Sequence, residues 1–166
     1  MKYTGYYQCP IGTLKITCNE TSIIALCPTC SREATAKTAM NTPMELAFRW
    51  LDEYFAKKNP EASNLPLDPQ GTPFQKAVWM YLRSIPYGTS TTYGHIAKDV
   101  TILLGKEKMS PQAVGQAVGA NPVGIILPCH RVLGTGGTLA GYAWGLDVKI
   151  WLLDHENIPY KYNACC

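Results

Sequence analysis

Apolar and polar residues alternate, or run apolar in short pieces, over the first 40 positions of the chain. Residues 2–8, 13–17 and 22–26 carry these patterns, and Pro10 and Gly12 mark a turn between the first two. A period of two is typical of strands that bury one face, and short segments separated by turn residues favour hairpins. The pattern predicts a small antiparallel sheet.

A helical pattern follows the predicted sheet. Residues 42–45, Thr-Pro-Met-Glu, combine a capping box with proline at the first helical position. Apolar residues then recur every three or four positions and predict an amphipathic helix over the sheet: Ala47, Trp50, Leu51, Tyr54 and Phe55. Residues 59–71 contain three prolines and predict an extended connection. We therefore expect an N-terminal α/β domain at residues 1–68 and a second domain at residues 69–166.

The second domain is predicted to be mostly helical. Residues 72–85 repeat the capping device, and residues 146–156 form a last amphipathic helix. Two short helices, residues 92–97 and 110–120, lie between them and suggest a helix-turn-helix. The second short helix is rich in alanine and glycine, which suits either a close approach to a partner's backbone or tight packing in a core. The residues of the last helix that we expect to face inward are Leu146, Ile150 and Leu153.

One short segment carries candidate chemistry. The apolar residues 124–127 resemble a buried strand that leads into Pro128, Cys129 and His130. A free thiol is only a few per cent ionised at pH 7, so a histidine beside it is what a thiolate nucleophile needs. A Cys-His pair in a core also has a simple packing explanation, and the dipeptide alone does not decide between the two.

Composition and charge narrow the classes of protein. Apolar residues make up 46% of the chain and charged residues 16%, which predicts a folded core and excludes a disordered chain. No apolar run is long enough to cross a membrane, and no export signal is evident, so we expect a cytoplasmic protein, or a nuclear one in a eukaryote. The net charge is +3, and all of the excess lies after residue 69, where eight Lys and Arg face five Asp and Glu. An excess of three positive charges is only weak evidence that the protein binds a polyanion such as a nucleic acid.

Cysteine usage agrees with a reducing compartment. Seven cysteines in a chain without an export signal indicate free thiols rather than a disulfide framework. Cys27 and Cys30 form a CxxC pair, but the three histidines lie far away in the second half of the chain. Finger-like zinc sites need two further ligands at close spacing, so we assign no metal and no cofactor.

The motifs of the second half resemble a known family. Asn121-Pro122, Pro128-Cys129-His130-Arg131-Val132, Gly141-Tyr142 and residues 152–156 are similar to those of the 6-O-alkylguanine-DNA alkyltransferases, which repair methylated DNA. The resemblance extends over residues 71–156. It implies a ribonuclease-H-like N-terminal domain, a C-terminal domain with a winged helix-turn-helix, and a monomer that binds double-stranded DNA containing alkylated guanine.

The resemblance also implies a role for individual residues. Cys129 matches the cysteine that accepts the alkyl group from the 6-oxygen of guanine, once and irreversibly, after the base is flipped out of the helix. The 4-oxygen of thymine is a second possible donor. His130 matches a water-linked base, Glu156 the carboxylate that orients it, and Asn121 a hinge asparagine. Arg131 is expected to form a structural ion pair. Residues that match the DNA contacts and the walls of the guanine pocket are Tyr93, Val118, Val132, Tyr142 and Ala143.

Four features depart from the family pattern, and one of them is Gly119, which stands where relatives often have a basic contact. Gln112 stands where relatives commonly place an arginine that fills the space of the flipped base. The loop around residues 103–108 is longer and contains Lys106 and Lys108, which could restore part of the charge. Trp144 stands where some relatives have glycine, and we expect its indole at the mouth of the pocket, where it would obstruct a benzyl group.

Two other classes of function remain as alternatives. A non-catalytic protein that binds alkylated DNA would lack the acceptor cysteine, and Cys129 is present. A cysteine hydrolase could use Cys129, His130 and Glu156, but no oxyanion-hole motif is evident, and the helix-turn-helix would then have no role.

Overall fold

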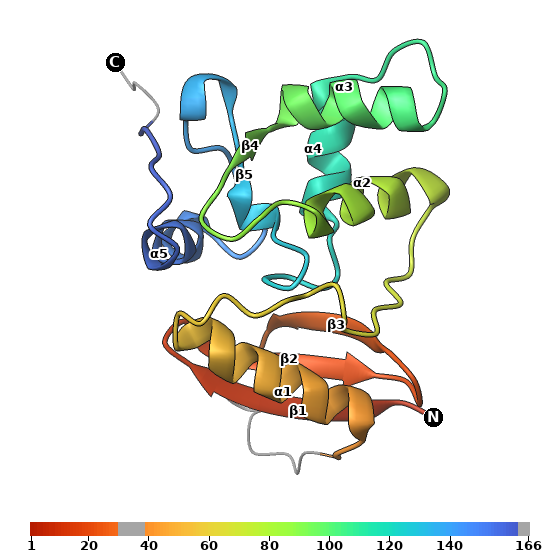
Figure 1. Ribbon diagram of the computed structural model, residues 1–166, viewed down its shortest axis with the longest axis vertical. Coiled ribbons are helices and arrows are strands. Elements are labelled where there is room, and N and C mark those ends of the chain that lie inside the picture. The colour runs from red at the N-terminus through yellow and green to blue at the C-terminus, as the bar shows by residue number, and fades with distance from the viewer. Residues whose placement is uncertain (30–38, 163–166) are drawn as a thin grey trace. The chain divides into compact units, whose positions relative to one another are not determined.

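The computed structural model describes residues 1–29 and 39–162, which fall into two units (Figure 1). The first unit comprises the described residues up to Gln70 together with Pro122–Ile126, and the second comprises Gly71–Asn121 and the described residues from Leu127 onward. That residues 1–68 and 69–166 fold as separate domains stays a prediction.

The first unit is built on the predicted antiparallel sheet. Strands β1 (Tyr3–Cys9), β2 (Gly12–Cys18) and β3 (Ile23–Pro28) pair in chain order, with Tyr3 opposite Cys18 and Ile16 opposite Leu26. Every second residue of β2 is buried, which is the period-two pattern of a sheet with one covered face.

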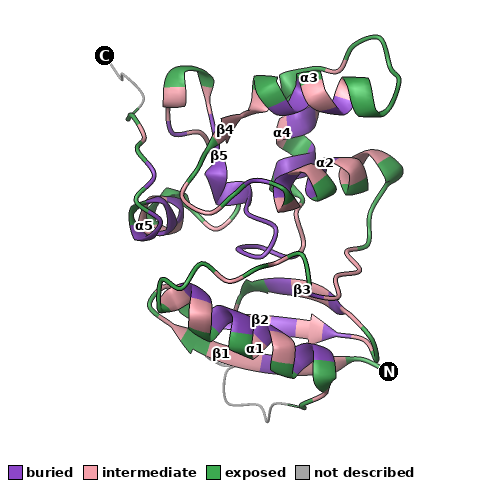
Figure 2. Cartoon of the chain, in the orientation of Figure 1, coloured by how far each residue is buried: buried purple, intermediate pink, exposed green. Residues whose placement is uncertain are grey.

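Helix α1 (Thr42–Phe55) covers one face of this sheet (Figure 1). Buried positions recur along α1, as Figure 2 shows in purple. They include Met44, Ala47, Trp50, Leu51 and Tyr54. The capping residue is Asn41, whose side chain accepts a hydrogen bond from the Met44 amide, so the prediction of a cap at Thr42 is wrong by one position.

Residues 122–126 lie along the sheet of the first unit as a turn. The Leu26 amide donates to Pro122 O at 2.8 Å, and the Gly124 amide donates to Leu26 O at 3.1 Å. The segment is buried as expected, but the predicted strand at residues 124–127 is wrong, because the chain turns there with Ile125 at φ +66°.

The second unit contains the predicted helices. α2 (Pro73–Arg83), α3 (Tyr93–Leu103) and α4 (Pro111–Gly119) pack against one another and are capped by Thr72, Thr92 and Ser110. α3 continues six residues beyond the predicted end at Ala97. The pair β4 (Thr91–Thr92) and β5 (Val132–Leu133) is parallel and joins the start of α3 to the segment that follows Cys129.

Helix α5 (Leu146–His155) closes the second unit. Its packing face contributes Leu153 to a cluster that contains Leu133, Leu139 and Ile158, with Ile150 packed against it. The expectation that Leu146 faces inward is wrong, because this side chain is 46% exposed at the first turn. No helix in the described part of the chain is long and apolar enough to cross a membrane.

Candidate active site

Cys129 lies at a cavity of the second unit. Pro128 leads into a short 3-10 turn, η1 (Cys129–Arg131), which buries the cysteine except for 7% of its surface. The thiol reaches a cavity of about 750 Å³, a size typical of small-molecule sites. A nucleophile at the wall of such a cavity can meet a planar ligand without being open to bulk water.

The cavity is formed by four segments of the second unit. These are the start of α3, one face of α4 with the residue Asn121 that follows it, the turn at Gly134 and Thr135, and residues 140–143, and Cys129 of η1 completes the lining. Seven residues predicted for the site line it: Tyr93, Gln112, Val118, Asn121, Cys129, Tyr142 and Ala143. Of these, Gln112 is exposed at the beginning of α4.

Val132 and Trp144 are not among the lining residues. Val132 is buried at the start of β5. The ring of Trp144 packs against the ring of Tyr142, with centroids 5.9 Å apart and planes tilted by 55°. The structure therefore places Trp144 beside a wall residue of the cavity.

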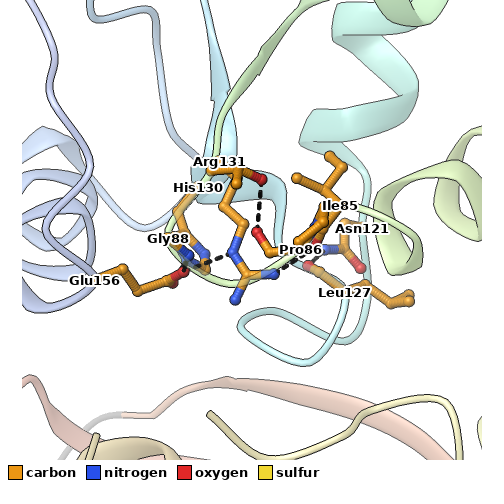
Figure 3. Close-up of polar contacts among 9 residues, drawn as sticks. Ile85, Pro86, Gly88, Asn121, Leu127, His130, Arg131 and Glu156 are labelled. Carbon is orange, nitrogen blue, oxygen red and sulfur yellow. Dashed lines mark hydrogen bonds and ion pairs between the residues drawn. The ribbon is translucent and has the colours of Figure 1, made fainter.

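His130, Arg131 and Glu156 form a buried polar network directly after Cys129 in η1 (Figure 3). His130 Nε2 pairs with Glu156 Oε2. Arg131 Nε donates to Glu156 Oε1 at 2.7 Å, which confirms the predicted pairing role of Arg131. The Gly88 amide also donates to Oε1 at 3.1 Å, and an Arg131 terminal nitrogen donates to Ile85 O at 2.7 Å. The carboxylate is thus held from three sides.

The network sets the charge states of its members. Burial alone would raise the pKa of Glu156, but the hydrogen bonds and charges of His130 and Arg131 outweigh it and lower the pKa to about 2. Burial lowers the pKa of His130, against the raising effect of Glu156. A neutral imidazole that is hydrogen-bonded to a carboxylate through one nitrogen can accept a proton at the other.

The second nitrogen of His130 is available for that purpose. Nδ1 is buried and has no hydrogen-bond partner among the described residues. A buried polar atom without a protein partner is typical of a position that a water molecule occupies.

Asn121 ties together the segment that carries the nucleophile. Its Nδ2 donates to Leu127 O at 2.7 Å, two residues before Cys129. The side chains of Asn121 and Tyr142 lower the pKa of the Cys129 thiol, although burial is the larger effect and the net pKa is raised.

Two residues near the site were not expected from the sequence. The first is Gly88, whose amide donates a hydrogen bond to Glu156. Gly88 has a left-handed backbone conformation, with φ at +76°, which glycine adopts more readily than other residues. Lys149 of α5 is fully buried. Lys149 and Glu156 are seven residues apart, which places them on the same face of a helix. This spacing in the sequence could have indicated that Lys149 lies near the site.

The described residues contain no candidate metal site. Within residues 1–29 and 39–162, no three His, Cys, Asp or Glu side chains gather closely enough to hold an ion. Cys27 is an exposed free thiol at the end of β3, whereas Cys30 lies outside the described residues.

The fold and the site are those of a protein that combines a helix-turn-helix with a buried thiol at a cavity, and comparison with known proteins gives the family. Residues 73–158 match the family model described as 6-O-methylguanine DNA methyltransferase, DNA binding domain, and residues 2–69 match the ribonuclease-like domain of the same family. The chain belongs to the 6-O-methylguanine DNA methyltransferase family, so the predicted family and fold class are confirmed.

Individual relatives cover nearly the whole chain. It is 38% identical over 165 residues to the methylated-DNA–protein-cysteine methyltransferase of Haemophilus influenzae, which covers 95% of this chain and 88% of the relative. The crystal structure of Mycobacterium tuberculosis O6-methylguanine methyltransferase is 36% identical, with 94% and 93% coverage and a TM-score of 0.77. A structure of Mycobacterium tuberculosis OGT in complex with DNA gives the same identity and TM-score, with coverage of 91% and 90%.

Proposed function

We propose that this protein repairs DNA by transferring a methyl group from the 6-oxygen of guanine to the sulfur of Cys129, once per protein molecule. The observation that carries the proposal is the Cys129 thiol at the cavity wall, next to the buried His130–Glu156 pair. The curated relatives that bear this activity in their names support it.

The substrate base reaches the thiol by leaving the double helix. An enclosed thiol cannot contact a base inside a duplex, so the base is flipped at a cost of roughly a few kcal/mol. The cavity accepts it between Tyr93 and Val118 on the helix side and Tyr142 and Ala143 on the other.

The proton of the thiol moves toward His130. A water molecule at Nδ1 bridges the thiol and the imidazole, and Glu156 stabilises the imidazolium that forms. Asn121 positions the turn that carries the thiol.

The transfer of the methyl group requires no reagent besides the protein and the DNA. The sulfur attacks the alkyl carbon, the C–S bond forms, and the bond between carbon and the 6-oxygen breaks. The electron pair of that bond stays on guanine, which takes up the proton released by the thiol. The product is a thioether, which lacks a good leaving group, so the protein acts once.

DNA binds through the exposed parts of α3 and α4 that surround the cavity. Helix α4 contains no Arg or Lys that could read base edges in the major groove, so the shape of the DNA and phosphate contacts made by main-chain groups and by residues outside α4 supply most of the affinity. We propose a monomer that works in the cytoplasm on double-stranded DNA with alkylated guanine.

The proposal is tested by the intact mass of the protein after incubation with a duplex that contains one O6-methylguanine. The wild type is expected to gain one methyl group, and Cys129→Ser none, while still binding the duplex. Cys27→Ser is the matched control, because it removes an exposed thiol of the other unit and should gain the methyl group. Binding without a mass gain by the wild type would instead indicate a non-catalytic DNA-binding protein, and turnover of an ester would indicate a hydrolase.

A further inference from the structure

Helix α4 carries a second glutamine at the cavity, one turn after Gln112. Gln112 and Gln116 both line the cavity and are exposed, and their spacing of four residues places them on one side of the helix. The side-chain amide of Gln116 has no hydrogen-bond partner among the described residues. Its carbonyl and amino groups can therefore accept hydrogen bonds from a ligand and donate hydrogen bonds to it.

Gln116 stands at the opening of the cavity. Lining residues that are exposed border the opening to solvent, whereas lining residues that are buried form the inner wall. On α4, which Figure 1 shows next to α3, Gln116 is exposed and Val118 is buried. The nucleophile lies beyond the end of α4, where Asn121 donates a hydrogen bond to Leu127 O, two residues before Cys129. At a rise of about 1.5 Å per residue, Gln116 lies roughly 7 Å before Asn121 along the helix axis.

The neighbours of a flipped nucleotide lie at this opening. When a base leaves the double helix, its nucleotide stays bonded to the next nucleotide on each side, and successive base pairs are about 3.4 Å apart. The strand can approach α4 closely at Gly119, because a Cβ atom there would meet no other atom within 4 Å. The side chain of Gln116, about one turn earlier on the same helix, then reaches the base pair next to the vacated position.

An uncharged amide suits a base edge better than a phosphate. It adds no positive charge, so it contributes little to the salt-dependent attraction between protein and DNA. It donates and accepts at the same time, and base edges present donors and acceptors in patterns that differ from one base pair to another. Gln112 and Gln116 are the polar side chains of α4, so recognition of a base by this helix depends on them.

We propose that Gln116 is a specificity residue that recognises the base pair next to the flipped guanine, so that the rate of methyl transfer depends on this neighbour. The inference rests on the proposed function. It gives the two glutamines of α4 different roles. Gln112 stands where relatives place the residue that fills the space of the flipped base, whereas Gln116 contacts the pair that remains stacked beside that space.

The test measures single-turnover methyl transfer, with the protein in excess, from duplexes that contain one O6-methylguanine and each of the four base pairs on either side of it. For each protein, the rate with the neighbour that the wild type favours most is divided by the rate with the neighbour that it favours least. Gln116→Met keeps the length of the side chain and removes the amide. We expect this ratio to be about fivefold smaller in Gln116→Met than in the wild type.

Gln70→Met is the matched control, because it changes an exposed glutamine of the first unit, and it should keep the wild-type ratio. Weak stacking of a neighbour eases flipping for every variant alike, and a poorly folded variant loses rate with every duplex, so neither effect alters the comparison of ratios. Equal ratios in the wild type and Gln116→Met would overturn the inference. A loss of rate that is the same for every neighbour, as a phosphate contact would give, would also overturn it.

Modified bases then identify the contacted atom. A 3-deazapurine next to the lesion removes an acceptor of the minor-groove edge, and a 7-deazapurine removes an acceptor of the major-groove edge. One of the two should slow the wild type and have no effect on the rate of Gln116→Met, and no effect of either on the wild type would overturn the inference. A wild type that accepts methyl from no duplex would count against the proposed function. Efficient transfer without any dependence on Gln116 would count against this inference alone.

Discussion

Arg131 Nε donates a 2.7 Å hydrogen bond to Glu156 Oε1, and both side chains are buried. The two residues are 25 positions apart, in η1 and directly after α5. The contact leaves the other carboxylate oxygen to His130. The residue that supports the imidazole is thus itself held in place by a cation.

Removing this cation should destabilise the protein. Arg131→Met leaves the carboxylate of Glu156 buried with less compensation, and breaking a buried pair from one side typically costs about 3–5 kcal/mol. Urea unfolding at pH 7 measures the loss in free energy of unfolding. Arg49→Met, at an exposed arginine of α1, is the control and should cost less than about 0.5 kcal/mol. If Arg131→Met also lost less than about 0.5 kcal/mol in free energy of unfolding, the ion pair between Arg131 and Glu156 would not stabilise the site.

Glu156 should make the stability of the protein depend on acid pH. Its pKa in the folded protein is about 2, below the ordinary value of 4.5. The unfolded chain therefore binds the proton first as pH falls, and the contribution of Glu156 is complete above about pH 4.5 and is lost between 4.5 and 2. Urea midpoints across this range should fall more steeply for the wild type than for Glu156→Gln. Parallel curves for the two proteins would contradict the assignment.

His130 is expected to control the rate of transfer and not its stoichiometry. His130→Asn removes the nitrogen that takes the proton of the thiol, and a positioned base contributes about 10²- to 10⁴-fold. Single-turnover kinetics at pH 7 should show that loss, with one methyl group per protein at the end. His95→Asn changes an exposed histidine of α3 and serves as the control. A wild-type rate in His130→Asn would exclude the role of base.

The contact of Trp144 with Tyr142 gives a second expectation for its substitution, beside that of an obstructing indole. At the mouth of the pocket it would exclude a benzyl group, and Trp144→Gly would accelerate the reaction of free O6-benzylguanine. Because its ring packs against Tyr142 and does not line the cavity, the indole instead supports the wall. We now expect Trp144→Gly to slow both methyl transfer and the reaction with benzylguanine. Single-turnover rates of the wild type and of Trp144→Gly with the two substrates distinguish these expectations. A faster reaction of Trp144→Gly with benzylguanine alone would show that the indole obstructs the pocket.

Elements with a local signal were predictable from the sequence. The strands of the first unit follow period-two alternation, and the caps at Thr72, Thr92 and Ser110 were identified because each side chain bonds an amide only three residues away. The cap of α1 was misplaced for a non-local reason. Asn41 also donates to Asn19 O, 22 residues earlier in the chain, and this contact favours it over Thr42.

Features that depend on tertiary contacts were not predictable. The apolar residues 124–127 have the composition of a strand, but hydrogen bonds to Leu26 turn the chain at Ile125, in a conformation that β-branched residues rarely adopt. Lys149 has the residue type of a surface position. Only its place on the face of α5 that also carries Leu152, Leu153 and Glu156 indicates burial.

The central claim is that Cys129 receives the methyl group, and peptide mapping tests it most directly. The protein is incubated with a duplex that contains O6-methylguanine with an isotope-labelled methyl group, then digested and fragmented in a mass spectrometer. The account predicts one labelled methyl group, on the sulfur of Cys129, and unmodified guanine in the DNA. A label on another residue, or a protein that remains unlabelled while the DNA is repaired, would contradict it.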